Sequence, residues 1–278
     1  MIAFFLKGYE KYKIPEFFFS DASQGVRMRK EEGKVTGKST AFPCPTALTS
    51  TWNTVLANQY AKSIGEECRL HNVAVLLDPG MNIYRISQNG RNFEYFGEDP
   101  FLASRMIENY FVGMQSTGTI TTLKHFLCNN ADFRLRLSNS IVGERALHEI
   151  YLPAFQAGIN AGAQAVMSSY NQFNGEGTAQ SNYVINQLLK KELGFNNLVM
   201  SDWWSVYDPE KTIKAGLTLE MPGHTNPTMG GLKELGAIYL KTNAERLIKE
   251  GQISEADING MVKTFLRAFI PMGLLIDA

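Results

Sequence analysis

The sequence predicts an α/β protein of the (β/α)8-like TIM-barrel class, irregular or incomplete. Two observations support this class: short apolar runs alternate with segments of helical periodicity in six rounds, and polar residues directly follow most of the apolar runs. Strand–helix alternation is typical of a parallel sheet, and a length of 278 residues suits one barrel. We therefore expect residues 1–278 to form a single domain.

The first half of the chain contains the first strands and helices of this pattern. Apolar runs predict strands over Ile14–Asp21 and Val73–Leu77. Helices are expected from Ser50 or Thr51 to Leu70, and from Asp99 to Gln115 with proline in the first turn. Residues 22–50 read as a long loop without an assignable structure, and a loop rich in glycine and asparagine extends to Gly97.

The alternation continues in the second half. The expected strands are Thr119–His125, Ala163–Tyr170, Leu198–Asp202 and the short Leu217–Met221. The expected helices are Glu144–Ala161, Ser181–Leu193, Leu232–Glu250 and Ser254–Met272, the last opened by a capping-box pattern. Six rounds are two short of a full barrel, so the missing strands lie in residues 22–50 and 80–98, or the barrel is irregular.

The composition narrows the functional class. Lys+Arg and Asp+Glu both number 27, which gives no support for binding nucleic acid or a membrane surface. The cysteines Cys44, Cys68 and Cys128 lack disulfide or zinc spacing and read as core or reduced thiols. No dinucleotide fingerprint or phosphate loop occurs, so no cofactor is expected. The first apolar run is too short for a signal peptide, and a cytoplasmic location is the default expectation.

Polar side chains gather at the predicted carboxyl ends of the strands, where parallel strands direct their loops to one mouth. These residues are Asp21, Arg91, Lys124-His125, Ser169-Tyr170-Asn171, Asp202-Trp203 and Glu220. Such a set suits a ligand with many hydroxyl groups, with an indole as the platform for a sugar ring. Each member also has a structural interpretation.

The structural interpretations are specific. Asp202 could cap the helix that follows, and Arg91 could merely pair with Glu94 or Glu98. Lys124 could pair with Asp132. His125 could be a core histidine with satisfied hydrogen bonds, and Tyr170 could serve packing. The succession of six polar strand ends favours a site.

At these positions the chain resembles glycoside hydrolase family 3, the β-glucosidase and β-xylosidase group, over nearly its whole length. The matching segments are Ser20–Arg27, Gly90–Pro100, Lys124–Phe126, Glu144–Pro153, Val166–Asn171 with Asn174-Gly175, Ser201–Trp203 and Leu219–Gly223. Several are long and occur in the family's order, so the match is more specific than one short motif. It implies the barrel domain of that family.

The resemblance also implies an activity and the residues that perform it. Asp202 is expected to be the nucleophile of a retaining hydrolase of β-linked glucosides or xylosides, which forms a covalent glycosyl-enzyme. Asp21, Arg91, Lys124 and His125 should bind the sugar hydroxyls, with Tyr170 against Asp202 and Trp203 on the leaving-group side. The family's next arginine falls at Leu135, so Arg134 and Arg136 are both kept as candidates.

Departures from the family pattern leave the acid/base residue unassigned. Ala22-Ser23 replaces the usual Gly-Pro, Thr218 replaces an Asp, and the loop Leu127–Asn130 lacks the Gly-His-rich motif of one sub-branch. In most of the family the acid/base carboxyl lies on a second α/β domain. Because this chain ends near the linker to that domain, we expect it to be either a fragment or a naturally shortened protein that needs a partner domain. Two alternatives stay open: a carbohydrate-binding remnant without turnover, and a barrel enzyme with Lys124 as a Schiff-base amine.

Overall fold

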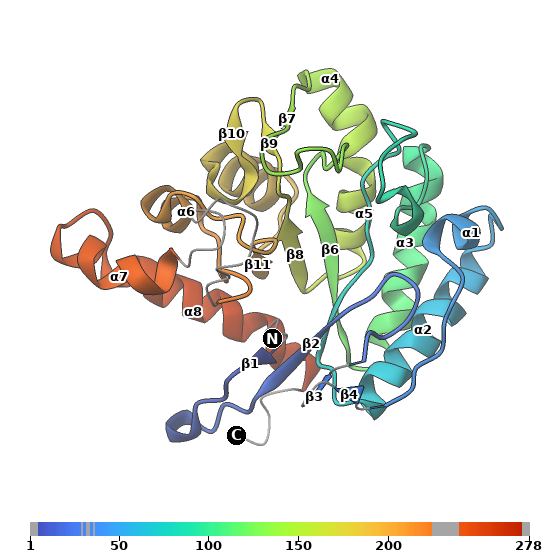
Figure 1. Ribbon diagram of the computed structural model, residues 1–278, viewed down its shortest axis with the longest axis horizontal. Coiled ribbons are helices and arrows are strands. Elements are labelled where there is room, and N and C mark those ends of the chain that lie inside the picture. Colours follow the sequence, from blue (N-terminus) through green and yellow to red (C-terminus); the bar gives the residue numbers. More distant parts are fainter. Residues whose placement is uncertain (1–4, 29, 32–33, 36, 224–238, 274–278) are drawn as a thin grey trace.

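The core of the molecule is a strongly curled six-stranded sheet (Figure 1). The computed structural model describes residues 5–28, 30–31, 34–35, 37–223 and 239–273. The strands follow the order β1 (Phe5–Leu6), β2 (Phe17–Asp21), β5 (Val75–Leu77), β6 (Ile120–Phe126), β8 (Ala165–Ser168) and β11 (Leu198–Met200). All neighbours from β2 to β11 are parallel, and β1 is antiparallel to β2. The prediction of a parallel, barrel-like sheet is confirmed.

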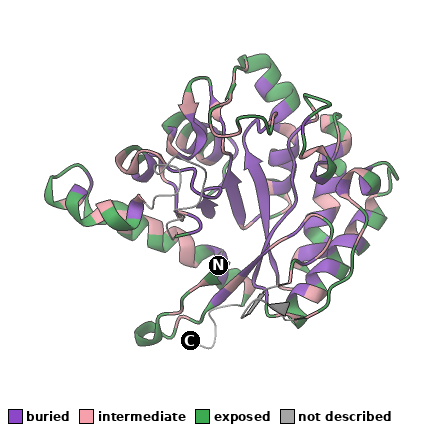
Figure 2. Ribbon diagram, in the orientation of Figure 1, coloured by how far each residue is buried: buried purple, intermediate pink, exposed green. Residues whose placement is uncertain are grey.

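Both faces of the sheet are buried at β5, β8 and β11, which explains why these strands read as continuous apolar runs (Figure 2). Side chains alternate between the faces along each strand. In β5, for example, Val75 and Leu77 point to the concave core, whereas Leu76 points to the helical layer. Helix α8 (Glu255–Phe269) packs against the concave core, where the Phe269 ring lies 4.3 Å from that of Phe17.

Helices cover the convex face. The first long pair is α2 (Thr54–Leu70) and α3 (Pro100–Gln115), whose first turns are capped by Asn53 and Asp99. These two helices approach so closely that a Cβ on Gly113 would lie 2.2 Å from the Asn58 carbonyl oxygen, so only glycine fits there. The next helices in this layer are α5 (Pro153–Asn160) and the π-helical η5 (Tyr183–Glu192).

Several expected elements differ from the observed ones. The expected helix Glu144–Ala161 is divided into α4 (Glu144–Ala146), the π-helix η3 (Leu147–Tyr151) and α5. Pro153 has no backbone N–H, so it cannot donate the next hydrogen bond of a continuous α-helix. The strand expected at Leu217–Met221 is reduced to one bridge between Leu219 and Met200. An unexpected helix, α6 (Pro209–Ala215), begins after the cap residue Asp208.

The two strands missing from the eightfold count are not where they were expected. Within the described part of residues 22–50 lie α1 (Pro45–Thr49) and the separate hairpin β3 (Lys30–Glu31) and β4 (Lys34–Val35). Residues 80–98 contain the 3-10 helix η2 (Asn92–Glu94) and one bridge from Gly80 to Lys124. The barrel of the described residues is therefore incomplete.

The remaining elements are short or lie at the chain's C-terminal side. A small three-stranded sheet contains β7 (Asn139–Ser140), β9 (Gln172–Phe173) and β10 (Glu176–Gly177). Single turns are η1 (Glu10–Tyr12), η4 (Thr178–Gln180) and η7 (Ile270–Met272). Of the expected helix Leu232–Glu250, residues 232–238 lie outside the described residues, and α7 (Leu240–Lys249) forms the rest. Helix α8 has the expected capping box between Ser254 and Asp257. None of the helices described is long and apolar enough to span a membrane.

Candidate functional site

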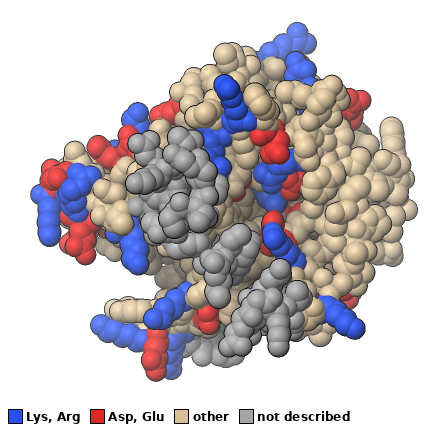
Figure 3. Space-filling model, viewed as in Figure 1, with Lys and Arg blue, Asp and Glu red and all other residues tan. Residues whose placement is uncertain are grey.

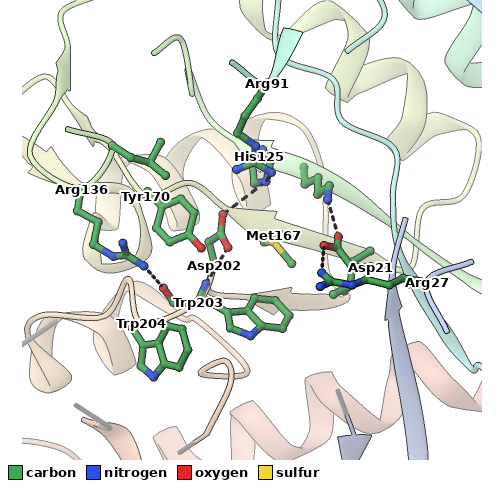
Figure 4. Close-up of a pocket in the computed structure, with 13 residues that line it drawn as sticks. Asp21, Arg27, Arg91, His125, Arg136, Met167, Tyr170, Asp202, Trp203 and Trp204 are labelled. Carbon is green, nitrogen blue, oxygen red and sulfur yellow. Dashed lines mark hydrogen bonds and ion pairs between the residues drawn. The ribbon is translucent and has the colours of Figure 1, made fainter. Parts of the chain in front are cut away.

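The carboxyl ends of the strands surround a pocket of about 360 Å³ (Figure 4). Acidic and basic side chains crowd together in the hollow at the centre of this face (Figure 3). The predicted site residues that line the pocket are Asp21, Arg91, Lys124, His125, Arg136, Tyr170, Asp202 and Trp203. They come from β2, β6 and the segments that follow β5, β6, β8 and β11, as expected if the parallel strands share one mouth.

Asp202 follows the end of β11 and points into the pocket. Its Oδ1 accepts a hydrogen bond of 2.7 Å from the Trp203 backbone N–H, whereas Oδ2 has no hydrogen-bond partner. Backbone hydrogen bonds from Ser201 to Leu219 and from Trp204 to Met221 fix this turn. Asp202 is not a helix cap, because the next helix is α6 and Asp208 caps it. The Asp202 carboxylate thus lines the pocket with Oδ1 fixed by the Trp203 N–H and Oδ2 buried without a hydrogen bond.

The charge state of Asp202 reflects opposing influences. Burial raises the pKa of Asp202, since an ionised carboxylate loses its hydration there. The positive charge of Arg91, the Trp203 N–H, the Tyr170 hydroxyl and the charge of Lys124 all act in the other direction. The Tyr170 hydroxyl lies beside the carboxylate, and burial, together with the nearby charge of Asp202, raises the pKa of this tyrosine well above its usual range.

His125 is held neutral, as a hydrogen-bond acceptor at Nε2. Burial and the charges of Arg91 and Lys124 move its pKa well below the ordinary value. Arg91 Nη2 lies 2.9 Å from His125 Nε2 and can only donate, so Nε2 carries no proton and Nδ1 does. The 3.4 Å approach of Nε2 to Asp202 Oδ2 is therefore neither an ion pair nor a hydrogen bond. The backbone of His125 is fixed by two hydrogen bonds with the Asn82 side chain.

An ion-pair network, in which Lys124 and Glu94 are buried and Asp21 is partly exposed, forms the wall between β2 and β6. Lys124 Nζ lies 3.2 Å from Asp21 Oδ1 and 3.5 Å from Glu94 Oε2, and Glu94 also accepts a hydrogen bond from Arg91. Burial tends to lower the pKa of Lys124, but the two carboxylates outweigh it and raise the pKa. In the same way Lys124, with Arg91 and Arg27, outweighs burial and lowers the pKa of Asp21. A Schiff-base lysine must lose its proton, so this network argues against that alternative for Lys124.

Aromatic and cationic side chains form the opposite wall. The Arg136 guanidinium lies 4.4 Å from the centroid of the Tyr170 ring and donates a 2.9 Å hydrogen bond to the Trp203 carbonyl. Trp203 and Trp204 line the same side and are almost fully buried. Arg136 therefore fixes both Tyr170 and the turn that carries Asp202.

Some of the predicted strand-end residues lie elsewhere. Arg134 is exposed over the Phe133 ring and does not line the pocket, because the chain turns at Arg134 with φ 49°. Glu220 accepts hydrogen bonds from the backbone N–H groups of Tyr239 and Leu240 at the start of α7. Ser169 and Asn171 donate to the Leu127 carbonyl and hold the loop after β6.

Sequence reasoning missed five other lining residues. They are Arg27, Leu77, Leu135, Met167 and Trp204. Leu77 and Met167 read as ordinary strand residues, and Arg27 stands six residues beyond its strand in a stretch without periodicity. The one available signal was the indole pair after Asp202, since both rings lie on the pocket wall.

The described pocket offers one reactive carboxylate and no evident acid. Its other lining carboxylate, Asp21, is ion-paired with a lowered pKa, which is unsuited to proton donation. Among the described residues no group of three or more His, Cys, Asp or Glu is placed to hold a metal ion. The arrangement suits nucleophilic attack by Asp202 on a hydroxyl-rich ligand.

Comparison with known proteins agrees with this geometry. The Glycosyl hydrolase family 3 N terminal domain model matches residues 5–268. Beta-glucosidase BoGH3A of Bacteroides ovatus is 37% identical over 269 residues, which cover 94% of this chain and 36% of the relative. An exo-alpha-(1->6)-L-arabinopyranosidase of Bifidobacterium longum is 39% identical over 228 residues, covering 79% of this chain and 30% of that protein.

Solved structures give the same picture. Beta-glucosidase 3B from Thermotoga neapolitana in complex with glucose superposes with a TM-score of 0.86 at 35% identity, covering 96% of this chain and 37% of that one. The Bifidobacterium adolescentis GH3 beta-glucosidase has a TM-score of 0.86 at 32% identity, covering 100% and 38%. The chain spans about a third of the length of these relatives.

Proposed function

Because the chain belongs to the glycosyl hydrolase family 3 N-terminal domain family, we propose that it is the nucleophile-bearing part of a retaining glycosidase that acts on β-linked glucosides or xylosides. Relatives described as beta-glucosidases support the reaction class, and one solved with glucose supports the ligand. The observation that carries the proposal is the Asp202 carboxylate, which lines the pocket just after β11 and has one oxygen, Oδ2, without a hydrogen-bond partner.

In the proposed reaction an oxygen of the Asp202 carboxylate attacks the anomeric carbon, the bond to the leaving oxygen breaks, and a covalent glycosyl-enzyme forms. Water then attacks the same carbon, gives up a proton to the group that protonated the leaving oxygen or, in its absence, to solvent, and the Asp202 carboxylate is released. Arg91 and Lys124 supply positive charge beside the site, and burial makes the Asp202 anion less well solvated than it is in water. The Tyr170 hydroxyl and the Trp203 N–H orient the carboxylate.

The proton for the leaving oxygen comes, in this proposal, from a second α/β domain outside the described pocket, whichever polypeptide carries it. Within the described pocket Asp21 is unsuited to the task, and the relatives are about three times longer than this chain. General acid catalysis contributes about 10²–10⁴-fold, so its absence slows poor leaving groups most. A dinitrophenolate leaves without a proton and should still be released.

The test compares β-glucosides and β-xylosides that carry dinitrophenolate or methoxide as leaving groups. We expect slow release of dinitrophenolate, negligible hydrolysis of the methyl glycosides, and no release by Asp202→Gly. Added azide should restore release by Asp202→Gly and yield the α-glycosyl azide, which proves that the variant is folded and lacks only its nucleophile. Glucose binding without any turnover by the wild-type chain would instead support the carbohydrate-binding remnant.

A further inference from the structure

Arg136 differs from the other cations of the pocket wall because its guanidinium contacts two neighbours of Asp202 at once. The guanidinium carbon lies 4.4 Å from the centroid of the Tyr170 ring, and Nη2 donates a 2.9 Å hydrogen bond to the Trp203 carbonyl. Arg136 takes part in none of the ion pairs found among the described residues. Its charge is therefore available to the tyrosine ring and the peptide that it contacts.

The loop after β6 fixes this side chain through its backbone. The N–H groups of Leu137 and Ser138 both donate to the Arg134 carbonyl, at 2.7 and 2.9 Å, and close a tight turn around Arg136. The Gln172 N–H donates to the Ser138 carbonyl at 2.9 Å and ties the turn to β9. Of the two arginines in this turn, Arg134 is exposed and Arg136 lines the pocket.

The peptide between Trp203 and Trp204 depends on the Arg136 contact. Trp204 has a φ of 54°, a value that residues other than glycine rarely adopt, so its surroundings must hold this peptide in place. The Trp204 N–H donates to the Met221 carbonyl at 3.0 Å, and the Trp203 carbonyl accepts the bond from Arg136. Trp203 also supplies the N–H that holds Asp202 Oδ1. Loss of Arg136 therefore releases one side of the turn that orients the carboxylate.

The contact with Tyr170 acts on the same carboxylate through a second route. The Tyr170 hydroxyl lies beside Asp202 (Figure 4). Burial and the charge of Asp202 raise the pKa of Tyr170, and the positive charge of Arg136 opposes them. Because a more acidic hydroxyl donates a stronger hydrogen bond to a carboxylate, Arg136 strengthens the hold of Tyr170 on Asp202. Both groups that orient the carboxylate thus rely on one guanidinium.

We propose that Arg136 is a positioning residue, which holds Asp202 in the orientation for attack through Tyr170 and Trp203 and does not itself bind the sugar. This inference rests on the proposed function. A residue that orients the nucleophile changes the rate at which the bond to the anomeric carbon forms. A residue that binds a sugar hydroxyl group equally in the ground state and the transition state changes how tightly the sugar is held. The two roles are therefore separable by experiment.

The test follows labelling by 2-deoxy-2-fluoro-β-glucosyl fluoride at increasing reagent concentration, which separates the maximal rate from the half-saturating concentration. Arg136→Ala should lower the maximal rate about 30-fold, as expected for a misplaced reactive group, and change the half-saturating concentration by less than about threefold. Arg134→Ala is the matched control, because Arg134 lies in the same turn, is exposed and does not line the pocket. It should match the wild type in both quantities.

Rescue by guanidinium ion provides a second readout. Because Arg136 lines the pocket, the space left by Arg136→Ala opens into it. Guanidinium chloride at a concentration that does not denature the protein should restore most of the labelling rate, and sodium chloride at the same ionic strength should not. An unchanged maximal rate in Arg136→Ala, a change confined to the half-saturating concentration, or no rescue by guanidinium would overturn the proposal.

If the wild type is not labelled, the nucleophile proposal fails, and calorimetry then decides the role of Arg136 separately. An iminosugar whose protonated nitrogen replaces the anomeric carbon pairs with the Asp202 carboxylate, whereas glucose carries no such charge. Arg136→Ala should weaken binding of the iminosugar about tenfold and leave the affinity for glucose within about threefold of the wild type. Equal losses for the two ligands, no loss for either, or a wild type that binds neither contradicts a positioning role.

Discussion

Replacement of Asp78 by asparagine should change how the stability of the protein depends on pH. Asp78 ends the buried run of β5 and points into the helical layer, where Tyr110 donates a 2.6 Å hydrogen bond to Oδ2 and Oδ1 has no partner. Burial raises the pKa of Asp78 from 3.8 to about 8, although the charge of Lys124 and the Tyr110 hydrogen bond oppose it. The folded protein therefore holds a proton on Asp78 at neutral pH, where the unfolded chain does not.

The sign and size of the effect follow from linkage. Between the unfolded and folded pKa values of Asp78 the native state binds more protons, so this group's contribution to stability falls as pH rises. The fall is about 1.4 kcal/mol per pH unit, or roughly 4 kcal/mol from pH 5 to pH 8, and it ends above the folded pKa. Asparagine cannot titrate, so Asp78→Asn removes this slope.

Urea denaturation of wild type and Asp78→Asn at several values between pH 5 and 9 provides the assay. The difference between the two free energies of unfolding isolates Asp78, because the other titrating groups are common to both proteins. It should shift in favour of the variant as pH rises and become constant above about pH 8. If the free energies of unfolding of the two proteins changed with pH in parallel, the reasoning would be refuted, because folding would then not change the affinity of Asp78 for its proton.

Three further predictions concern the pocket wall and the surface. Lys124→Met removes the amine shared by Glu94 and Asp21 and should cost about 2 kcal/mol in urea denaturation, less than for a fully buried pair because the Asp21 side chain is 43% exposed; a loss below about 0.5 kcal/mol contradicts the network. Glu220→Ala removes the acceptor of two backbone N–H groups at α7 and should lower stability by about 1 kcal/mol, with faster hydrogen exchange confined to α7. The Glu144 carbonyl and Glu192 raise the pKa of His148. The protonated imidazole therefore stabilises the fold slightly at low pH, and this contribution is lost as pH rises through the pKa of His148 in the folded protein. His148→Gln should abolish this contribution to the pH dependence of the free energy of unfolding. The same pH dependence in the variant and the wild type would disprove it.

Local pattern was enough to predict most of the fold. Strands buried on both faces produce apolar runs, and caps such as Asp99 mark helix starts, so these elements could be located within a few residues. Helix α6 was missed because its seven residues carry too little periodicity. The reduction of the last strand to a single bridge at Leu219 depends on pairing with β11, which no local signal contains.

The site was predictable only where strand ends define it. Arg91, Lys124 and Asp202 were found because the carboxyl ends of parallel strands converge. The choice between Arg134 and Arg136 depends on a positive φ in the loop, which sequence does not reveal. Arg91 also fulfils its structural interpretation, since it pairs with Glu94 while lining the pocket. An ion pair with Glu94 and a place in the pocket wall are therefore compatible for Arg91.

The most direct measurement is the mass of the protein after incubation with 2-deoxy-2-fluoro-β-glucosyl fluoride, followed by peptide mapping. The account predicts a gain of one fluorosugar per chain, located on the peptide that contains Asp202 and absent from Asp202→Asn. A sugar attached to Asp21 or Glu94, or no adduct on a protein that binds glucose, would contradict it.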